Sequence, residues 1–125
     1  MPVRSLTSSV LRWPDAATVL EAARRWAENL AAHEPAVSAV GCFGSYARGE
    51  AGVGSDLDLL AIVRDGCGAG PAAGGPWAVE DLPVPADLLT YTASQWRELR
   101  RGNGRFYRTL CREARWLAGE PPEPA

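Results

Sequence analysis

The sequence predicts a single α/β (α+β) domain. Apolar side chains recur at helical spacing from Val19 to Leu30, whereas residues 37–43 and 56–63 are apolar runs of strand length. The length of 125 residues suits one domain that spans residues 1–125 and folds without disulfides or a structural metal. We expect its packed core to cover about residues 14–118.

The first helix is predicted from its start signal and its apolar stripe. The segment Trp13-Pro14-Asp15 places a proline and an acid where a first helical turn begins. Apolar residues then recur every three or four positions, at Val19, Ala23, Trp26 and Leu30. This spacing predicts an amphipathic helix of about 18 residues that ends at Pro35.

Two buried strands are expected next. Residues 37–43 form a partly β-branched apolar run, which Gly44-Ser45 ends abruptly. In the run 56–63, alternate residues share a face, so Asp56 and Asp58 lie on the same side of the strand. Beyond Asp58 both faces are apolar, which predicts a central strand with its carboxylates at one exposed end.

The C-terminal third predicts a strand, two helices and an edge strand. Residues 84–91 are apolar, and prolines at and before their start favour an irregular beginning or an edge position. Asp87 lies near that beginning. Ser94 is predicted as the N-cap of a helix of about two turns, and Gly102-Asn103-Gly104 separates this helix from a final one. Residues 114–118 are expected to form the edge strand.

Two segments predict irregular structure. Residues 64–80 are rich in Gly and Pro and predict a flexible loop, for which a function and mere tolerated length are both open. Trp77 lies in this loop and is a candidate for stacking on adenine or on a partner. Residues 119–125 are Pro-rich and predict a disordered tail.

Composition narrows the classes of function. The formal net charge is −2, which argues against a protein whose main task is to coat nucleic acid. All 13 cationic residues are arginine, so lysine-based chemistry, including a P-loop, is excluded. The three cysteines lack metal-ligand spacing, and no apolar run approaches the length of a bilayer. We therefore expect a cytoplasmic protein without membrane contact.

The most informative pattern is Gly44-Ser45, ten residues, then Asp56-x-Asp58. Alone, the first pair is an ordinary turn and the second an ordinary strand entrance, but together they set a phosphate-sized turn beside two carboxylates. Gly44 lacks a Cβ, which lets a phosphate approach the backbone, and Ser45 offers an amide and a hydroxyl donor. Arg48 is a candidate for a bidentate phosphate contact. The pattern is typical of metal-dependent phosphoryl or nucleotidyl transferases.

The acidic residues predict a site for divalent cations. Residues two apart on a strand have Cα atoms roughly 6.5 Å apart on one side, so Asp56 and Asp58 can bind metal together. Oxygen-only ligation favours Mg²⁺ or Mn²⁺ over zinc. Asp87 is the candidate third carboxylate because it begins an apolar strand, as Asp58 does. Its expected role is to bind the activating metal and accept the proton of the nucleophile.

The segments Gly44-Ser45-x-Ala47-Arg48-Gly49 and Ser55-Asp56-x-Asp58-Leu59 resemble the signature of the minimal nucleotidyltransferases, the MNT branch of the DNA polymerase β-like superfamily. The resemblance implies the nucleotidyltransferase fold, a mixed sheet flanked by helices. It also implies that Asp56, Asp58 and Asp87 hold two Mg²⁺ ions. ATP would then be the substrate, held by Gly44 and Ser45 with Arg48 and Ser55 nearby.

The same resemblance implies a partner. Proteins of this branch commonly pair with a helical HEPN protein in toxin–antitoxin modules, and some transfer AMP to a tyrosine of that ribonuclease toxin. Larger relatives carry an added helical domain over the nucleotide, for which this chain leaves no room. A partner, as a homodimer or hetero-oligomer, is therefore expected to complete the site. Stable direct binding of nucleic acid is not expected.

Two alternative functions stay open, namely an antitoxin that only blocks its toxin sterically and an enzyme that modifies a small molecule such as an antibiotic.

A further open point is a cluster of seven arginines within 19 residues, opposed only by Glu98 and Glu113. It is either a solvated helical face or a docking surface for an acidic partner or for RNA bound to that partner. Its members are Arg97, Arg100, Arg101, Arg105, Arg108, Arg112 and Arg115.

Overall fold

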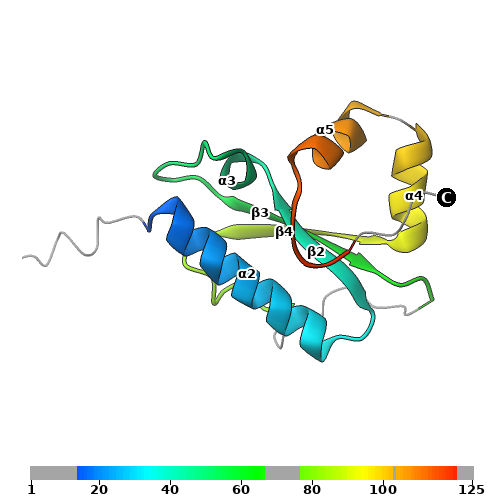
Figure 1. The fold of residues 1–125 in the computed structure, drawn as a ribbon, viewed down its shortest axis with the longest axis horizontal. Helices are drawn as coiled ribbons and strands as arrows, with labels where there is room; N and C mark the ends of the chain where they lie inside the picture. The colour runs from blue at the N-terminus through cyan, green and yellow to red at the C-terminus, as the bar shows by residue number, and fades with distance from the viewer. Residues whose placement is uncertain (1–13, 67–76, 103, 121–125) are drawn as a thin grey trace, which may run out of the picture.

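A mixed four-stranded sheet lies between helices in the computed structural model, which describes residues 14–66, 77–102 and 104–120 (Figure 1). The strands are β2 (Val37–Phe43), β3 (Leu57–Val63), β4 (Ala86–Thr92) and β5 (Arg115–Gly119), in the order β4-β3-β2-β5. Strand β2 is antiparallel to β3 and β5, whereas β3 and β4 are parallel. The predicted α+β class and mixed sheet are confirmed.

Helix α2 (Ala16–His33) covers one face of the sheet and has the predicted length of 18 residues (Figure 1). Asp15 caps its start, because its carboxylate accepts a hydrogen bond of 2.7 Å from the Thr18 amide. The predicted apolar stripe is buried, and Arg24 on the opposite face forms ion pairs with Glu21 and Glu28. The amphipathic prediction is therefore confirmed.

Strand β3 is central and covered on both faces, as predicted. On one face Leu57, Leu59, Ala61 and Val63 join the core that α2 completes. On the other face Leu60 and Ile62 pack with Trp96 of α4 (Ala93–Gly102) and Leu110 of α5 (Arg105–Glu113). The strand begins at Leu57, so Asp56 precedes it. Asp58 belongs by alternation to the face that α4 and α5 cover.

Ser94 is not the N-cap of α4, and this prediction is wrong. Strand β4 runs directly into the helix, so Thr92 takes the cap position. Its hydroxyl accepts a hydrogen bond of 3.0 Å from the Gln95 amide, and the Gln95 side chain accepts one of 2.9 Å from the Thr92 amide. This reciprocal pair is a capping box. The Ser94 hydroxyl instead donates to Asp65 at 2.7 Å.

Trp77 is buried in the core on the α2 side, which is not where a stacking platform for adenine or a partner would lie. The nearby Ala78 carbonyl accepts a 3.0 Å hydrogen bond from the Trp26 indole, so this end of the predicted loop is packed. Residues 67–76 of that loop lie outside the described residues.

The predicted edge strand is found at β5, one residue further along than expected. The predicted tail therefore begins too early, because Gly119 pairs with Ala39 at the end of β5. Residues 121–125 of the tail are outside the described part of the chain. None of the helices described here combines the length and hydropathy needed to cross a membrane.

Candidate active site

The Gly44-Ser45 turn lies directly against a carboxylate of the neighbouring strand. Gly44 directly follows β2 and has φ 77° and ψ −155°, a region that essentially only glycine adopts. A Cβ at this position would lie 2.4 Å from Oδ2 of Asp58. Glycine is therefore required here twice, for its backbone conformation and for the space that the Asp58 carboxylate occupies.

A short helix, α3 (Ser45–Arg48), starts at this turn, and Gly49 in the left-handed conformation ends it. Amide groups in the first turn of a helix have no carbonyl partner within that helix, and Ser45 is the first residue of α3. The predicted phosphate donors, the amide and hydroxyl of Ser45, therefore directly follow Gly44, whose backbone lies close to the Asp58 carboxylate.

Asp58 and Asp87 lie side by side on parallel strands. Each is the second residue of its strand, and the two are register partners between β3 and β4. Neighbouring strands are about 4.8 Å apart, so the two side chains leave the same face of the sheet at adjacent positions. The structure thus brings together two carboxylates that are 29 positions apart in the sequence, at the end of the sheet where Gly44 lies.

The electrostatics of Asp58 reflect a group of acids. Partial burial raises the pKa of its carboxyl above the usual range, and the nearby carboxylates of Asp87 and Asp56 raise that pKa further. The Arg48 guanidinium opposes this shift. Asp56 and Asp87 are exposed, whereas Asp58 is half-buried. Asp58 therefore lies near both of the other predicted acids.

The donor set suits a hard divalent cation, because carboxylate oxygens are preferred by Mg²⁺ and because positive charge would remove the repulsion that raises the Asp58 pKa. Within residues 14–66, 77–102 and 104–120, however, no three His, Cys, Asp or Glu side chains are arranged to hold a metal ion. Since Asp56 and Asp87 are exposed, their side chains have room to turn towards Asp58. The acids thus suit the cation in their chemistry, and a shared metal site would require such a rearrangement.

Arg48 is exposed, but carboxylates of this chain hold its guanidinium. Its guanidinium forms ion pairs with Glu50 at 2.9 Å and with Glu113, the last residue of α5, at 3.0 Å. Arg48 therefore ties the short helix after the glycine turn to α5, while its charge still acts on Asp58. Its assignment as a phosphate ligand stays a prediction, and binding a phosphate would require it to leave one of these carboxylates.

Ser55 has a structural partner in the turn that leads into β3. Its hydroxyl accepts a hydrogen bond of 2.9 Å from the Gly52 amide, and its own amide donates to the Gly52 carbonyl at 3.0 Å. It thereby fixes the chain just before Asp56. A direct contact between Ser55 and a nucleotide also stays a prediction.

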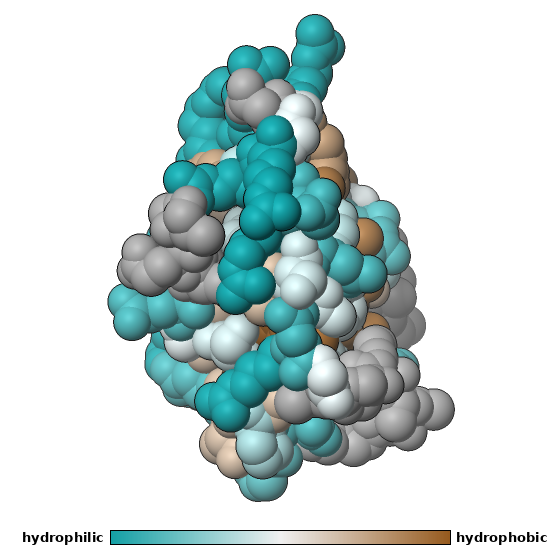
Figure 2. Space-filling view, turned by 90° about the vertical axis from the view of Figure 1, so that its right-hand side faces the viewer, coloured by the Kyte–Doolittle hydropathy of each residue, from teal (hydrophilic) through white to brown (hydrophobic). Residues whose placement is uncertain are grey.

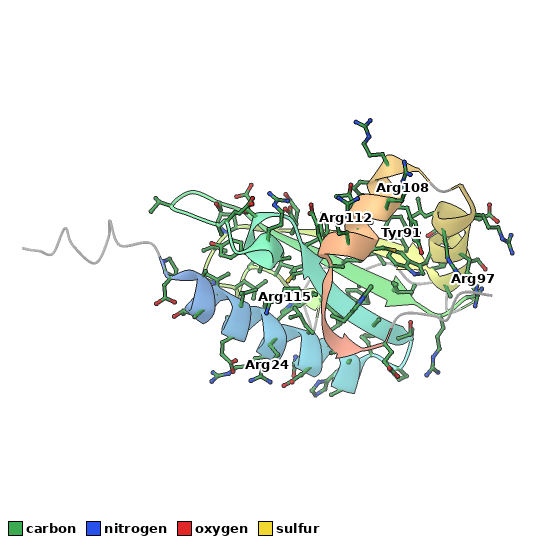
Figure 3. The ribbon with its side chains drawn as sticks, turned by 45° about the horizontal axis from the view of Figure 1, so that its top comes forward. Arg24, Tyr91, Arg97, Arg108, Arg112 and Arg115 are labelled. Atoms are coloured by element: carbon green, nitrogen blue, oxygen red, sulfur yellow. The ribbon has the colours of Figure 1, made fainter. Side chains whose placement is uncertain are left out.

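Glu113 is the residue near this site that sequence reasoning did not single out. It lies 65 positions from Arg48 in the sequence, and only the packing of α5 beside α3 brings the pair together. In the sequence, Glu113 stands out only as one of two acids in the arginine-rich segment 97–115. Figure 3 shows α5 above the sheet beside α3, with Arg112 projecting from it.

The glycine turn, the mixed sheet and the acidic strand ends are consistent with the class of phosphoryl-transfer domains. A family model described as "Nucleotidyltransferase domain" matches residues 23–111, a range that contains the turn and all three acids. The chain therefore belongs to the nucleotidyltransferase domain family, whose membership supports a nucleotidyl transfer function.

The fold is also found in a solved structure described as a "putative nucleotidyltransferase from Sulfolobus solfataricus". That structure matches with a TM-score of 0.52 and 17% sequence identity, over 92% of this chain and 87% of the other. At this identity the likeness concerns the fold alone, and the predicted nucleotidyltransferase fold is confirmed. No curated protein matches the chain.

Proposed function

We propose that this protein transfers AMP from ATP to a hydroxyl group of a partner protein and thereby acts as an antitoxin. Family membership supports nucleotidyl transfer. The observation that carries the proposal is the contact between the Gly44 backbone and the Asp58 carboxylate, with Asp87 beside it in register. The resemblance to the minimal nucleotidyltransferases supports a HEPN-type ribonuclease as the partner and its tyrosine as the acceptor.

The proposed reaction forms a bond between the acceptor oxygen and the α-phosphorus of ATP, and it breaks the bond from that phosphorus to the β-phosphate oxygen. Pyrophosphate leaves with the bonding electrons. Gly44 allows the triphosphate to lie close to the backbone, and Ser45 donates hydrogen bonds to its oxygens. The Asp87 carboxylate accepts the proton of the acceptor hydroxyl, for which an exposed position suits it.

Asp56, Asp58 and Asp87 are the residues that would hold Mg²⁺. When bound, Mg²⁺ neutralises charge on the triphosphate and on the attacking oxygen. Without the cation, partial burial and the neighbouring Asp87 and Asp56 carboxylates make the ionised form of Asp58 less favourable than that of a free carboxylate and so raise its pKa. Ionisation of the carboxylates and binding of Mg²⁺ would thus favour each other.

A second function is favoured by one observation. Because the described residues contain no preformed group of three metal ligands, a protein that only binds and blocks its partner would look the same at this site. In that case the acids would be dispensable for inhibition. The two functions therefore differ in what Asp56 and Asp58 contribute.

The discriminating experiment combines the protein with ATP, Mg²⁺ and the product of the neighbouring gene. The readouts are the intact mass of that product and its ribonuclease activity. We expect a mass increase of one adenylyl group and loss of ribonuclease activity with the wild type, and neither with Asp56→Ala or Asp58→Ala. Inhibition that survives both substitutions without a mass change would refute the enzymatic function and support steric inhibition.

A further inference from the structure

The arginine at the end of α3 has a fixed backbone and a side chain that two carboxylates hold. The Arg48 amide donates a hydrogen bond of 3.0 Å to the Gly44 carbonyl, so the residue is tied to the glycine turn. Its Nε contacts Oε1 of Glu50 at 2.9 Å, and its Nη1 contacts Oε1 of Glu113 at 3.0 Å. The Arg48 charge also acts on the Asp58 carboxylate. The two glutamates therefore set the position of a cation near the candidate active site.

These two glutamates differ in how firmly they can hold the guanidinium. The side chain of Glu50, just after α3, is 66% exposed, whereas that of Glu113, the last residue of α5, is 20% exposed. Ion pairs between exposed side chains contribute little to stability, because water and salt compete for both charges. Glu113 is therefore the firmer anchor, and Glu50 is the partner that Arg48 can leave at lower cost.

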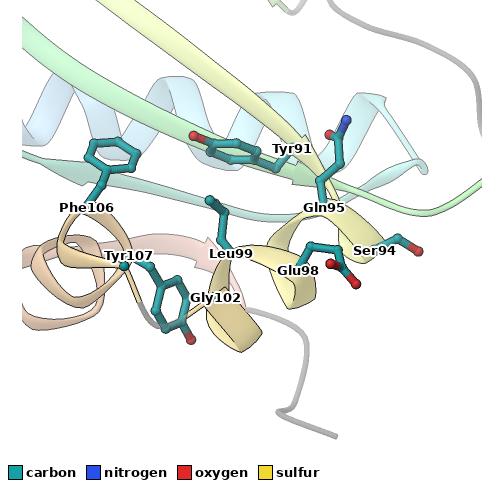
Figure 4. Close-up of a pocket in the computed structure, with 9 residues that line it drawn as sticks. Tyr91, Ser94, Gln95, Glu98, Leu99, Gly102, Phe106 and Tyr107 are labelled. Carbon is teal, nitrogen blue, oxygen red and sulfur yellow. The ribbon is translucent and has the colours of Figure 1, made fainter.

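Helix α5 is packed well enough to carry such an anchor. Its Leu110 is buried, and its Tyr107 packs edge-on against Trp96 of α4 with ring centroids 5.4 Å apart. Its first turn lies beside α4 and β4, around an apolar hollow of about 530 Å³ (Figure 4). Residues that line this hollow include Tyr91, Leu99 and Phe106. Because α5 is held in this way, its last residue, Glu113, has a set place beside Arg48.

The position of Glu113 is unfavourable for α5 itself. The C-terminal end of a helix carries partial negative charge, which favours a cation and disfavours an acid in the last turn. Partial burial adds a further cost, because it removes water from the carboxylate. Arg48, which lies 65 positions earlier in the sequence, offsets both costs. The contact with Arg48 therefore accounts for an acid at this position, and the needs of the helix do not.

The geometry of the guanidinium determines which of its donors a phosphate can take. Among its five N–H groups, one on Nε and one on Nη2 point the same way and together match two phosphate oxygens. Glu50 takes Nε, and Glu113 takes Nη1 on the other side of the group. A phosphate that binds Nε and Nη2 would therefore displace Glu50 and leave the contact with Glu113 intact.

We propose that Glu113 is a positioning residue for nucleotidyl transfer, which keeps Nη1 of Arg48 while Nε and Nη2 turn from Glu50 to the triphosphate of ATP. This role rests on the proposed function, since it requires a triphosphate beside Gly44 and Ser45. Without Glu113, the guanidinium can give both Nε and Nη2 to Glu50, which then occupies the donors that a phosphate needs. Glu113 thus acts through Arg48 and does not touch the nucleotide.

The test measures the affinity for α,β-methylene-ATP with Mg²⁺ by calorimetry, because this analogue lacks the bond that breaks in transfer. Glu113→Gln should weaken binding about tenfold, which corresponds to one hydrogen bond to a charged group. Removal of a negative charge near the site would by itself strengthen the binding of an anion, so the direction of the change separates positioning from a general charge effect. Glu50→Gln should strengthen binding by less than about fivefold, since it removes the competitor for Nε.

A double variant tests whether Glu113 acts through Arg48. Arg48→Gln should weaken binding at least as much as Glu113→Gln does, and adding Glu113→Gln to it should cause no further loss. A merely structural role of Glu113 would give the same loss in both backgrounds. Glu113→Asp keeps the carboxylate and should bind the analogue more tightly than Glu113→Gln.

The matched control is Glu98→Gln, because Glu98 also pairs with an arginine, Arg101, at 2.9 Å. It belongs to α4, at the end of the molecule that Figure 2 shows and where the surface is mostly hydrophilic. Glu98→Gln should leave the affinity for the analogue unchanged. Far-UV circular dichroism at the assay temperature checks that each variant is folded.

Binding that Glu113→Gln leaves unchanged or strengthens would overturn the positioning role, and so would equal losses with and without Arg48. The absence of analogue binding by the wild type would overturn it as well. Transfer of AMP to the product of the neighbouring gene is measured separately. Wild-type binding without transfer would count against the proposed function alone. Transfer by the wild type, with a Glu113→Gln variant that binds the analogue equally well, would count against the positioning role alone.

Discussion

Gly44→Ala should remove activity while leaving a folded protein. The backbone conformation at Gly44, φ 77° and ψ −155°, costs about 1–3 kcal/mol for a residue with a Cβ. The new Cβ would lie 2.4 Å from Oδ2 of Asp58, whereas ordinary contact begins at 3.4 Å. The carboxylate must therefore move by about 1 Å, and a displacement of this size at a reacting group costs on the order of 100-fold in rate.

The expected loss of stability is about 2 kcal/mol, which lowers Tm by roughly 6–10 °C for a chain of this size. Thermal unfolding followed by circular dichroism gives the stability, and single-turnover transfer of label from ATP gives the rate. The matched control is Gly49→Ala, because Gly49 has φ 77° but nothing lies within 4 Å of its new Cβ. Gly49→Ala should cost about 1–2 kcal/mol and keep nearly the wild-type rate.

A double variant isolates the contact with Asp58. In an Asp58→Ala background the clash is absent, so Gly44→Ala should cost only the strain of its backbone and less than in the wild type. The reasoning would be refuted if Gly44→Ala kept the wild-type rate, or if Gly49→Ala lost activity to the same extent. If Gly44→Ala lowered the free energy of unfolding equally in the wild type and in Asp58→Ala, the contact with Asp58 would have no energetic consequence.

Three further changes test the acids and the cap of α4. Asp58→Asn should raise the free energy of unfolding at neutral pH by about 1 kcal/mol, since a charge about 5 Å from another in a water-like dielectric costs that much. The pKa of Asp58 is raised in the folded state. Protonated Asp58 therefore stabilises the folded protein fully below the ordinary carboxyl pKa, and this stabilisation is lost as pH rises through the raised pKa of the folded state. Urea unfolding at acid and neutral pH checks this, and a gain that is equal at both would contradict it. Asp87→Asn should retain ATP binding by calorimetry but lose turnover, and full turnover would mean that Asp87 is not the proton acceptor. Thr92→Ala should lower stability by about 1 kcal/mol in chemical unfolding, because it removes the cap of α4. Ser94→Ala removes only an exposed hydrogen bond to Asp65 and should cost less, and an equal loss would contradict the assignment of Thr92 as the cap.

The sequence predicted the elements whose structure follows from the local pattern of apolar and polar residues. The α2 stripe has a clear helical period, and its predicted length of about 18 residues is found. The continuous apolar run of β3 predicted a strand over 56–63, and the strand found spans Leu57–Val63. The Gly44 turn and the pair Asp56 and Asp58 could be predicted as a site because their combined spacing is typical of phosphoryl or nucleotidyl transferases. The neighbouring position of Asp87 followed from treating its strand as equivalent to that of Asp58.

What the sequence did not predict depends on contacts between distant segments. Ser94 and Thr92 are both good cap residues, and the choice between them depends on how far β4 continues before the helix begins. The pairing of Arg48 with Glu113 joins positions 65 apart, so it needs the packed position of α5. The hollow lined by Tyr91, Leu99 and Phe106 is formed by residues of β4, α4 and α5, so it needs the packed positions of these elements.

The central claim is that the acids beside Gly44 move a nucleoside monophosphate, and the position of a radiolabel tests this claim most directly. The protein is incubated with Mg²⁺ and the product of the neighbouring gene, using ATP labelled at the α-phosphate in one reaction and at the γ-phosphate in the other. We predict label on the partner from α-labelled ATP only, and none with Asp58→Asn. Label from γ-labelled ATP, or α-label that persists in Asp58→Asn, would contradict the account.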